Sequence, residues 1–315
     1  MSNILIRRPG LASSALLALA LAVGAPAHAE EAAKTPYDII NKATAASPVT
    51  PTALRGNVTV LDGAGGSIVA LAGPQGLLLV DDGIAVSRAK IEEVLTGLRP
   101  GGLNFVINTH WHWDHTDGNG WAHEDGAKII AQRNTAAHLD KTIRVVEWGH
   151  TFDPVPAGYR PAMLVDEEKV MTFNGETVEI RHYMPSHTDG DLSVYFRKAN
   201  VLATGDTWWN GVYPFIDYVA GGSIDGMIRA ANWNIEKSGA DTIVVPGHGP
   251  VGSRTDLVAF RDMLVTIRDR VATLKAQGKS LDETIAAKPS AEFDAKWGGG
   301  VINPALFTQL VYRGV

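Results

Sequence analysis

The stretch Thr109-His110-Trp111-His112-Trp113-Asp114-His115 brings four side chains with metal-binding atoms into one short segment. Its pattern is H-x-H-x-D-H. Imidazole and carboxylate groups suit zinc when no thiolate is available, and the chain contains no cysteine. The residue types of this segment therefore predict a metal site rather than a packing role.

A predicted strand leads into this stretch. Residues 104–108 form a short apolar run, and residues 87–98 before it have apolar side chains at the helical spacing, with Ile91, Val94 and Leu98 on one face. The ligands should therefore lie on the loop that leaves the carboxyl end of a strand. Such loops are a usual location for sites in α/β folds.

Short apolar runs separated by turn residues predict a series of further strands. These runs are residues 58–61, 67–71, 77–81, 128–131, 177–183, 192–197, 200–203 and 241–245. Helices are expected at 134–139 and at 255–277, the latter as an outer covering helix. The run at 241–245 ends in Pro246-Gly247-His248-Gly249, so a second strand also leads into a histidine. This arrangement predicts an α/β protein with two sheets that meet at one edge and helices outside them.

Residues 1–29 are predicted to be a secretory signal peptide. Arg7 and Arg8 precede an apolar stretch at 11–23, and Ala27-His28-Ala29 has the small-x-small pattern of a cleavage site. An apolar core of about 13 residues is shorter than the about 20 that span a bilayer, so no stable membrane anchor is expected. The route of export stays open.

The rest of the chain divides into a lead-in and one domain. Residues 30–55 contain many Ala, Thr and Pro residues and are expected to be loosely structured, with one helical turn at 37–40. Residues 56–315 are long enough for a single domain with a sizeable core. The tail beyond residue 277 receives no assignment.

Composition limits the class of partner. The chain has a net charge of −6, and loss of the leader would make it more negative. Nucleic-acid binding depends on Lys and Arg that neutralise phosphates, so a nuclease is disfavoured. Without cysteine there is neither a disulfide nor a lipidated cysteine. We therefore expect a protein free in the periplasm or the medium.

Four segments together resemble the metallo-β-lactamase superfamily over about residues 58–250. They are the H-x-H-x-D-H run, Ser186-His187-Thr188, Gly205-Asp206-Thr207 and Gly247-His248-Gly249, in the family's order after a strand. The resemblance implies a four-layer αβ/βα sandwich, with two mixed β-sheets and helices outside. It also implies a dinuclear centre, in which His110, His112 and His187 hold one metal, Asp114, His115 and His248 hold the other, and Asp206 bridges them.

The chemistry of these residue types agrees with a catalytic centre. Two sets of three ligands each leave an open position, as catalytic zinc sites do. We expect two Zn²⁺ ions, with iron or manganese as alternatives, and a bridging hydroxide that attacks a carbonyl compound. Two Zn²⁺, two carboxylates and one hydroxide sum to about +1, so a small and anionic substrate is favoured.

Three residues are candidates for catalytic roles, namely Asp114, Tyr213 and the bridging Asp206. Asp114 is expected to orient the nucleophilic water and transfer a proton, and the alternative is that it only caps a helix that begins at His115. Tyr213, seven residues after Asp206, is a candidate for contact with an oxyanion. In the β-lactam hydrolases of the superfamily, the position of Asp206 is usually Cys or Ser. A bridging Asp is typical of the branches that cleave lactones, esters and thioesters.

Aromatic residues near the ligand segments predict either core packing or an aromatic-walled pocket. They are Trp111, Trp113, Trp208, Trp209, Tyr213 and Phe215. The favoured function is an exported zinc hydrolase of a lactone, ester, thioester or β-lactam. The alternatives are an iron-dependent oxygenase of the same fold and a non-catalytic metal-binding accessory protein.

Overall fold

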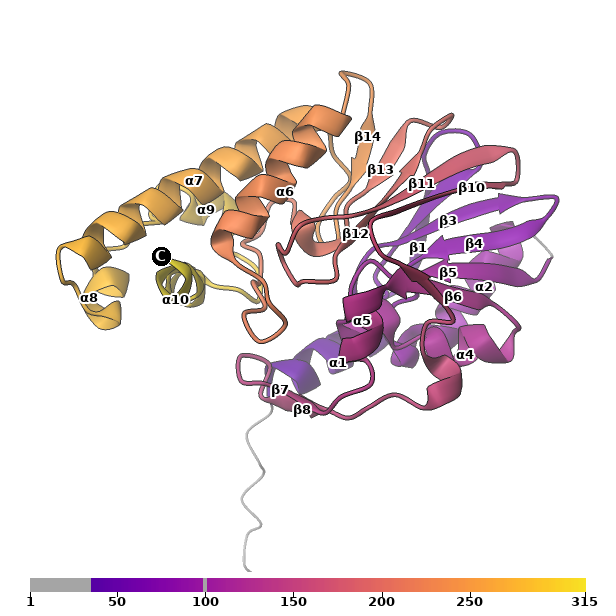
Figure 1. Ribbon diagram of the computed structural model, residues 1–315, viewed down its shortest axis with the longest axis horizontal. Coiled ribbons are helices and arrows are strands. Elements are labelled where there is room, and N and C mark those ends of the chain that lie inside the picture. The colour runs from indigo at the N-terminus through magenta and orange to yellow at the C-terminus, as the bar shows by residue number, and fades with distance from the viewer. Residues whose placement is uncertain (1–34, 99–100) are drawn as a thin grey trace, which may run out of the picture. The chain divides into compact units, whose positions relative to one another are not determined.

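The computed structural model describes residues 35–98 and 101–315. The predicted signal peptide at 1–29 lies outside the described residues, as does the first part of the lead-in. Two β-sheets pack face to face, and helices cover their outer faces (Figure 1). The predicted αβ/βα sandwich is confirmed.

The first sheet has the strand order β1-β2-β3-β4-β5-β6-β9. Its strands are β1 (Thr50–Ala53), β2 (Val58–Asp62), β3 (Ile68–Gly73), β4 (Gly76–Val80), β5 (Leu103–Ile107), β6 (Lys128–Gln132) and β9 (Met163–Val165). The pairs from β1 to β4 are antiparallel, whereas β4, β5, β6 and β9 are parallel. Parallel strands end at the same edge of a sheet, so the loops after β4 and β5 are neighbours.

The second sheet has the order β10-β11-β12-β13-β14. Its strands are β10 (Glu168–Phe173), β11 (Glu176–His182), β12 (Leu192–Phe196), β13 (Val201–Ala203) and β14 (Ile243–Val245). Only the last pair, β13 and β14, is parallel, so the loops after these two strands also leave one edge together. A separate hairpin joins β7 (Ile143–Val145) to β8 (His150–Phe152).

Alternating side chains build the layers. In β4, Leu78 and Val80 lie in the core between the two sheets, whereas Leu77 and Leu79 pack with Ile91 beneath the outer helices. This alternation is the two-residue period of a strand with both faces covered. Because both faces of β4 are covered, its side chains are apolar on both faces. This apolar run is the signal from which the strand was predicted.

Helices flank both sheets (Figure 1). They are α1 (Pro36–Ala46), α2 (Arg88–Leu98), α3 (Trp113–Thr116), α4 (Asn119–Glu124), α5 (Arg133–His138), α6 (Ile224–Lys237), α7 (Arg254–Ala276), α8 (Leu281–Ala286), α9 (Asp294–Trp297) and α10 (Pro304–Gly314). The predicted covering helix at 255–277 corresponds to α7, which lies along α6 outside the second sheet. No helix among the described residues combines the length and apolar character that a membrane span requires.

The lead-in and the tail are more ordered than the sequence predicted. The helix expected as one turn at 37–40 extends over α1, which begins with a capping box between Thr35 and Asp38. The lead-in also supplies the edge strand β1. The tail forms α8, α9 and α10, and the apolar side of α10 lies in the same core as α6 and α7. Short helices with few apolar residues give a weak periodic signal, and their order comes from packing.

The packing of α10 can be tested with a matched pair of leucines. Leu310 in α10 is fully buried, whereas Leu164 in β9 is 42% exposed. We expect Leu310→Ala to lower the free energy of unfolding by about 2–5 kcal/mol through lost burial and a cavity. Leu164→Ala should change it by about 0.5 kcal/mol or less. Urea denaturation measures both, and equal losses would contradict the packing of α10.

Candidate metal centre

The seven predicted ligands come from loops that leave the same edge of the two sheets. His110 lies three residues after β5, and α3 then carries Asp114 and His115. The remaining ligands follow strands of the second sheet: His187 follows β11, Asp206 follows β13 and His248 follows β14. Because parallel neighbours end together, residues nearly 140 positions apart in sequence become neighbours in space.

Backbone contacts join the two sheets beneath the ligands. The Leu192 N–H donates to the Thr109 carbonyl at 2.7 Å, and the Ser67 N–H donates to the Gly247 carbonyl at 2.8 Å. A Cβ atom at Gly247 would lie 1.9 Å from Oδ1 of Asp206, so only glycine fits beside this carboxylate. These main-chain contacts thus fix the positions of the ligand loops of one sheet relative to those of the other.

The first ligand group contains His110, His112, His187 and Asp206, whose ligand atoms all lie within 4.8 Å of one another. Nδ1 of His112 is 3.0 Å from Nε2 of His187. Oδ2 of Asp206 is 3.5 Å from Nε2 of His187 and 3.7 Å from Nε2 of His110. All four side chains are buried.

The second ligand group contains Asp114, His115 and His248. Nε2 of His248 is 3.2 Å from Oδ2 of Asp114 and 3.4 Å from Nε2 of His115. Asp206 also touches this group, because its Oδ1 is 3.1 Å from Nε2 of His115 and its Oδ2 is 3.4 Å from Nε2 of His248. The carboxylate of Asp206 therefore lies between the two groups, where a bridging ligand has to be.

Hydrogen bonds on the far side of the rings determine which nitrogen faces the centre. His187 Nδ1–H donates to the carbonyl of Phe215 at 2.9 Å, which leaves its Nε2 with a lone pair. His112 Nε2–H donates to Asp217 at 2.9 Å, which leaves its Nδ1 with a lone pair. Two lone pairs then face each other at 3.0 Å. A cation between them removes this repulsion, so the donor set fits a metal ion.

Asp81 orients two of the predicted ligands, and sequence reasoning missed this role. Its Oδ2 accepts from Nδ1 of His115 at 2.8 Å and from the Thr109 hydroxyl at 2.8 Å. Since the Thr109 hydroxyl donates its only hydrogen to Asp81, it accepts from Nδ1 of His110 at 3.0 Å. Asp81 follows β4, the parallel neighbour of β5, and it adopts a positive φ of 60°. A carboxylate at the end of a buried strand was the available signal.

Asp217 is the second orienting carboxylate that sequence reasoning missed. Its Oδ2 accepts from His112 and, at 3.2 Å, from the indole N–H of Trp111. Its Oδ1 accepts from the backbone N–H groups of Val219 and Ala220 at 2.9 and 3.0 Å. Such partners fix the tautomer and orientation of a ligand histidine. No pattern in the sequence connects residue 217 with residue 112.

Buried charge also favours cations at this centre. Although burial opposes its ionisation, the nearby His248, His115 and His110 hold the pKa of Asp206 well below its usual range. Burial opposes protonation of His248, yet Asp206 and Asp114 raise its pKa to about 9. Burial lowers the pKa of His110, whose Nε2 is buried and lacks any hydrogen-bond partner among the described residues. A metal ion would displace the protons of the second group and occupy the free face of His110.

The candidate catalytic residues other than Asp206 are Asp114 and Tyr213, and their surroundings differ. Asp114 lies within α3 rather than before it, and the helix has His112 at its N-cap without a side-chain capping bond. The capping alternative is therefore not what the structure shows. The Tyr213 hydroxyl donates to Asp294 at 2.8 Å, and its ring stacks on Phe307. The structure thus joins Tyr213 to the C-terminal helices and does not bring it to the ligand groups.

The aromatic residues divide between core and pocket. Trp113 and Trp209 line a pocket of about 280 Å³ together with His112, Asp114, Asp206 and His248, so the ligand groups open into it. Trp208 and Phe215 are buried in the core. Trp148, in the turn between β7 and β8, lines the same pocket. Sequence reasoning missed it because it lies 33 residues after the ligand run.

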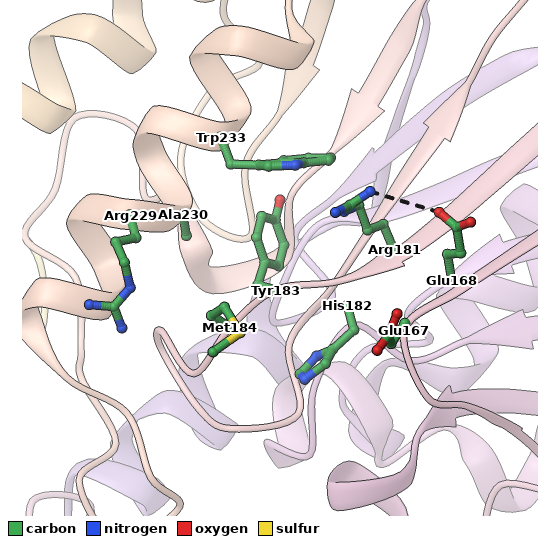
Figure 2. A pocket seen from close by; sticks show the side chains of 9 residues that line it. All are labelled: Glu167, Glu168, Arg181, His182, Tyr183, Met184, Arg229, Ala230 and Trp233. Atoms are coloured by element: carbon green, nitrogen blue, oxygen red, sulfur yellow. Dashed lines mark ion pairs between the residues drawn. The ribbon is translucent and has the colours of Figure 1, made fainter.

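Three other described histidines have their partners away from the ligand groups. His138 is 2.7 Å from a carboxylate oxygen of Asp189, and His150 stacks on Tyr37. His182 contacts the Asp191 carbonyl, and it lines a second pocket of about 690 Å³ between β11 and α6, away from the ligands (Figure 2).

Comparison with known proteins places the chain in a family. The sequence model of the metallo-beta-lactamase superfamily matches residues 61–248, which include all seven predicted ligands. The chain belongs to the metallo-beta-lactamase superfamily. A probable metallo-hydrolase of Methanocaldococcus jannaschii is 29% identical over 163 residues, which cover 48% of this chain and 72% of that protein. Membership in this superfamily indicates a metal-dependent hydrolase.

Solved structures show the same fold. A metallo-beta-lactamase from Pontibacter korlensis has a TM-score of 0.54 at 18% identity, over 69% of this chain and 98% of that one. A stereoselective inverting sec-alkylsulfatase from Pseudomonas sp. has a TM-score of 0.61 at 18% identity, over 84% of this chain and 50% of that one. At this identity the likeness is one of fold alone.

The role of Asp217 in this superfamily member can be tested by Asp217→Asn. The amide can present a donor to His112, which then turns its own N–H toward the centre and loses a lone pair for the metal. We expect metal affinity to fall about 10–100-fold, measured by competition with a chelator. Asp262→Asn, at a surface ion pair with Arg261, is the control and should leave affinity unchanged. Unaltered affinity in folded Asp217→Asn would contradict the role.

Proposed function

We propose that this protein is an exported dinuclear zinc hydrolase that cleaves a carbonyl C–O, C–S or C–N bond. The observation that supports the proposal most strongly is the position of Asp206. Its carboxylate oxygens lie within 3.7 Å of nitrogens from both ligand groups. A carboxylate within reach of both ligand groups is expected of a two-metal site, where it would bridge the ions.

Two zinc ions at these groups would supply an activated water and polarise the substrate carbonyl. The chain's own residues then position the reaction. Asp206 holds the two groups at a fixed separation, and the hydrogen bonds of Asp81 and Asp217 orient the ligand rings. Asp114 lines the pocket with its carboxylate 3.2 Å from His248. It is placed to accept a proton from the attacking water and return it to the leaving atom.

The bridging aspartate favours esters, lactones and thioesters over β-lactams within this proposal. The apolar segment at 11–23 and the small residues at 27–29 support export, as the sequence analysis anticipated. An exported enzyme would act on small molecules in the periplasm or the medium.

Metal content tests the dinuclear assignment. We expect about two zinc ions per chain by mass spectrometry of the purified protein, because two three-ligand groups share one bridge. One iron per chain with oxygen uptake would instead support the oxygenase alternative. Two zinc ions without turnover of any substrate would support the accessory-protein alternative.

Replacement of the bridge tests its role directly. Asp206→Ala should lower the zinc content of both ligand groups, since each group loses a ligand. Turnover should fall by about 100-fold or more, because the distance between the two groups is no longer fixed. Asp225→Ala removes an exposed carboxylate from α6 and serves as the control. Loss of a single zinc ion would show that Asp206 belongs to one group only.

A substrate panel then separates the bond types. The zinc-loaded protein should hydrolyse an uncharged ester, a lactone or a thioester faster than a chromogenic cephalosporin. Turnover of a secondary alkyl sulfate alone would contradict carbonyl cleavage and assign a sulfate ester instead.

A further inference from the structure

The pocket over the ligand groups has uncharged walls apart from the predicted ligands themselves. Apart from the four predicted ligands, its lining is apolar, glycine or threonine, and none of the described residues that line it is Lys or Arg. The wall residues are Ile40, Thr44, Gly65, Trp113, Trp148, Trp209, Val212, Gly249, Gly300 and Val301. A volume of about 280 Å³ lies at the small end of ligand pockets, so the substrate is small.

The three tryptophans form the main hydrophobic surface. Trp113, Trp148 and Trp209 are 6%, 4% and 5% exposed. Their indole N–H groups have no hydrogen-bond acceptor among the described residues. These N–H groups are themselves buried, so the tryptophans present apolar ring surface to the pocket rather than hydrogen-bond donors.

Segments far from the ligands hold these walls in place. The Tyr37 N–H donates to the Trp148 carbonyl at 3.2 Å, which ties α1 to the hairpin turn. The Trp113 ring lies 5.7 Å from that of Trp148 in an edge contact. In the C-terminal part of the chain, the Tyr213 N–H donates to the Trp297 carbonyl at 2.8 Å and fastens the tail that carries Val301. The pocket is therefore built into the fold before a substrate arrives.

Charge argues against a substrate with its own carboxylate. Such a group gains no partner from the pocket wall, and desolvation of an unpaired charge is costly. Bound zinc would offset the carboxylates of Asp114 and Asp206, so a carboxylate at the far end of a substrate would meet only an uncharged wall in a chain with a net charge of −6. Cationic side chains occur instead in the pocket between β11 and α6, where Figure 2 shows Arg181 beside Trp233 and Arg229 at the other side of the lining.

We propose that the substrate is an uncharged ester or lactone with an apolar substituent that packs against Trp113, Trp148 and Trp209. This inference rests on the proposed hydrolase function and narrows its substrate class. It excludes β-lactams and other acyl compounds whose recognition depends on a free carboxylate. The sequence favoured an anionic substrate from the metal charge alone, whereas the pocket wall favours a neutral one.

A matched pair of lactones tests the substrate class. One carries a hexyl side chain, and the other carries the same chain with a terminal carboxylate. We expect the zinc-loaded full-length protein to prefer the neutral lactone by about tenfold or more in kcat/KM. Equal or higher kcat/KM for the carboxylate lactone would overturn the inference while leaving the hydrolase function intact.

Trp148→Ala tests the hydrophobic wall without removing a predicted metal ligand. The kcat/KM for the hexyl lactone should fall about tenfold, mainly through KM, while an unsubstituted lactone changes little. Trp233→Ala removes a tryptophan of the other pocket and serves as the control (Figure 2). Equal losses for both lactones, with zinc content unchanged, would contradict packing of the side chain on Trp148.

Val301→Lys supplies the cation that the wall lacks. Val301 is 53% exposed, so a lysine can be accommodated there. We expect the preference for the neutral lactone to shrink at least severalfold. Val170→Lys, at a 62% exposed position on β10, should leave the preference unchanged. An unchanged preference in Val301→Lys would show that charge at the pocket does not set the substrate class.

Binding without turnover separates failure of this inference from failure of the proposed function. Hexyl-substituted cyclopentanone resembles the lactone and cannot be hydrolysed, and tryptophan fluorescence follows its binding. It should bind about tenfold more tightly than its analogue with a terminal carboxylate, and Trp148→Ala should remove the difference. If no ester, lactone, thioester or β-lactam is hydrolysed, the hydrolase proposal fails, and this binding result alone decides the inference. Equal affinities would overturn it.

Discussion

The carboxylate of Asp206 is buried among four imidazoles from three other segments, and the arrangement of the site depends on it. An isolated buried carboxylate is costly, because burial removes its hydration. Here His110, His115, His187 and His248 surround it at 3.1–3.7 Å, and metal ions between these atoms would complete the compensation. The glycine at 247 is part of the same constraint, since any larger residue would displace the carboxylate.

Hydrogen bonds to the outer nitrogens of the ligand histidines hold their rings in place around the Asp206 carboxylate. Asp81 ends the parallel neighbour of β5 and reaches both His115 and, through Thr109, His110. Asp217 performs the same task for His112 from a loop after Asp206. Each of these bonds turns the inner nitrogen of its ring toward the centre, where a metal would bind it after displacing any proton held there. The sandwich thus determines ligand tautomers as well as ligand positions.

Part of the pocket wall comes from segments outside the superfamily match. The superfamily match covers residues 61–248, whereas Ile40, Thr44, Gly300 and Val301 lie outside it and line the pocket. Contacts of Tyr37 and Tyr213 tie these segments to the loops around the ligands. The predicted ligands therefore all lie within the matched segment, whereas the pocket wall combines matched residues with residues from both ends of the described chain. This division explains why the family name alone leaves the substrate open.

The sequence by itself predicted the fold class, most strands of both sheets and the seven candidate ligands. Each of these leaves a local signal, such as an apolar run, a helical period or a cluster of imidazoles beside a strand end. Short elements such as α9 and β9, and the continuation of α1 beyond one turn, lack such a signal and form because neighbouring segments cover them. Only the tertiary structure showed that Asp81 and Asp217 orient the ligands, that Trp148 walls the pocket and that Tyr213 faces the C-terminal helices. The physical reason is the range of these contacts: Trp111 and His112 meet Asp217 across more than 100 residues, and a hydrogen bond over that distance leaves no periodic pattern in the sequence.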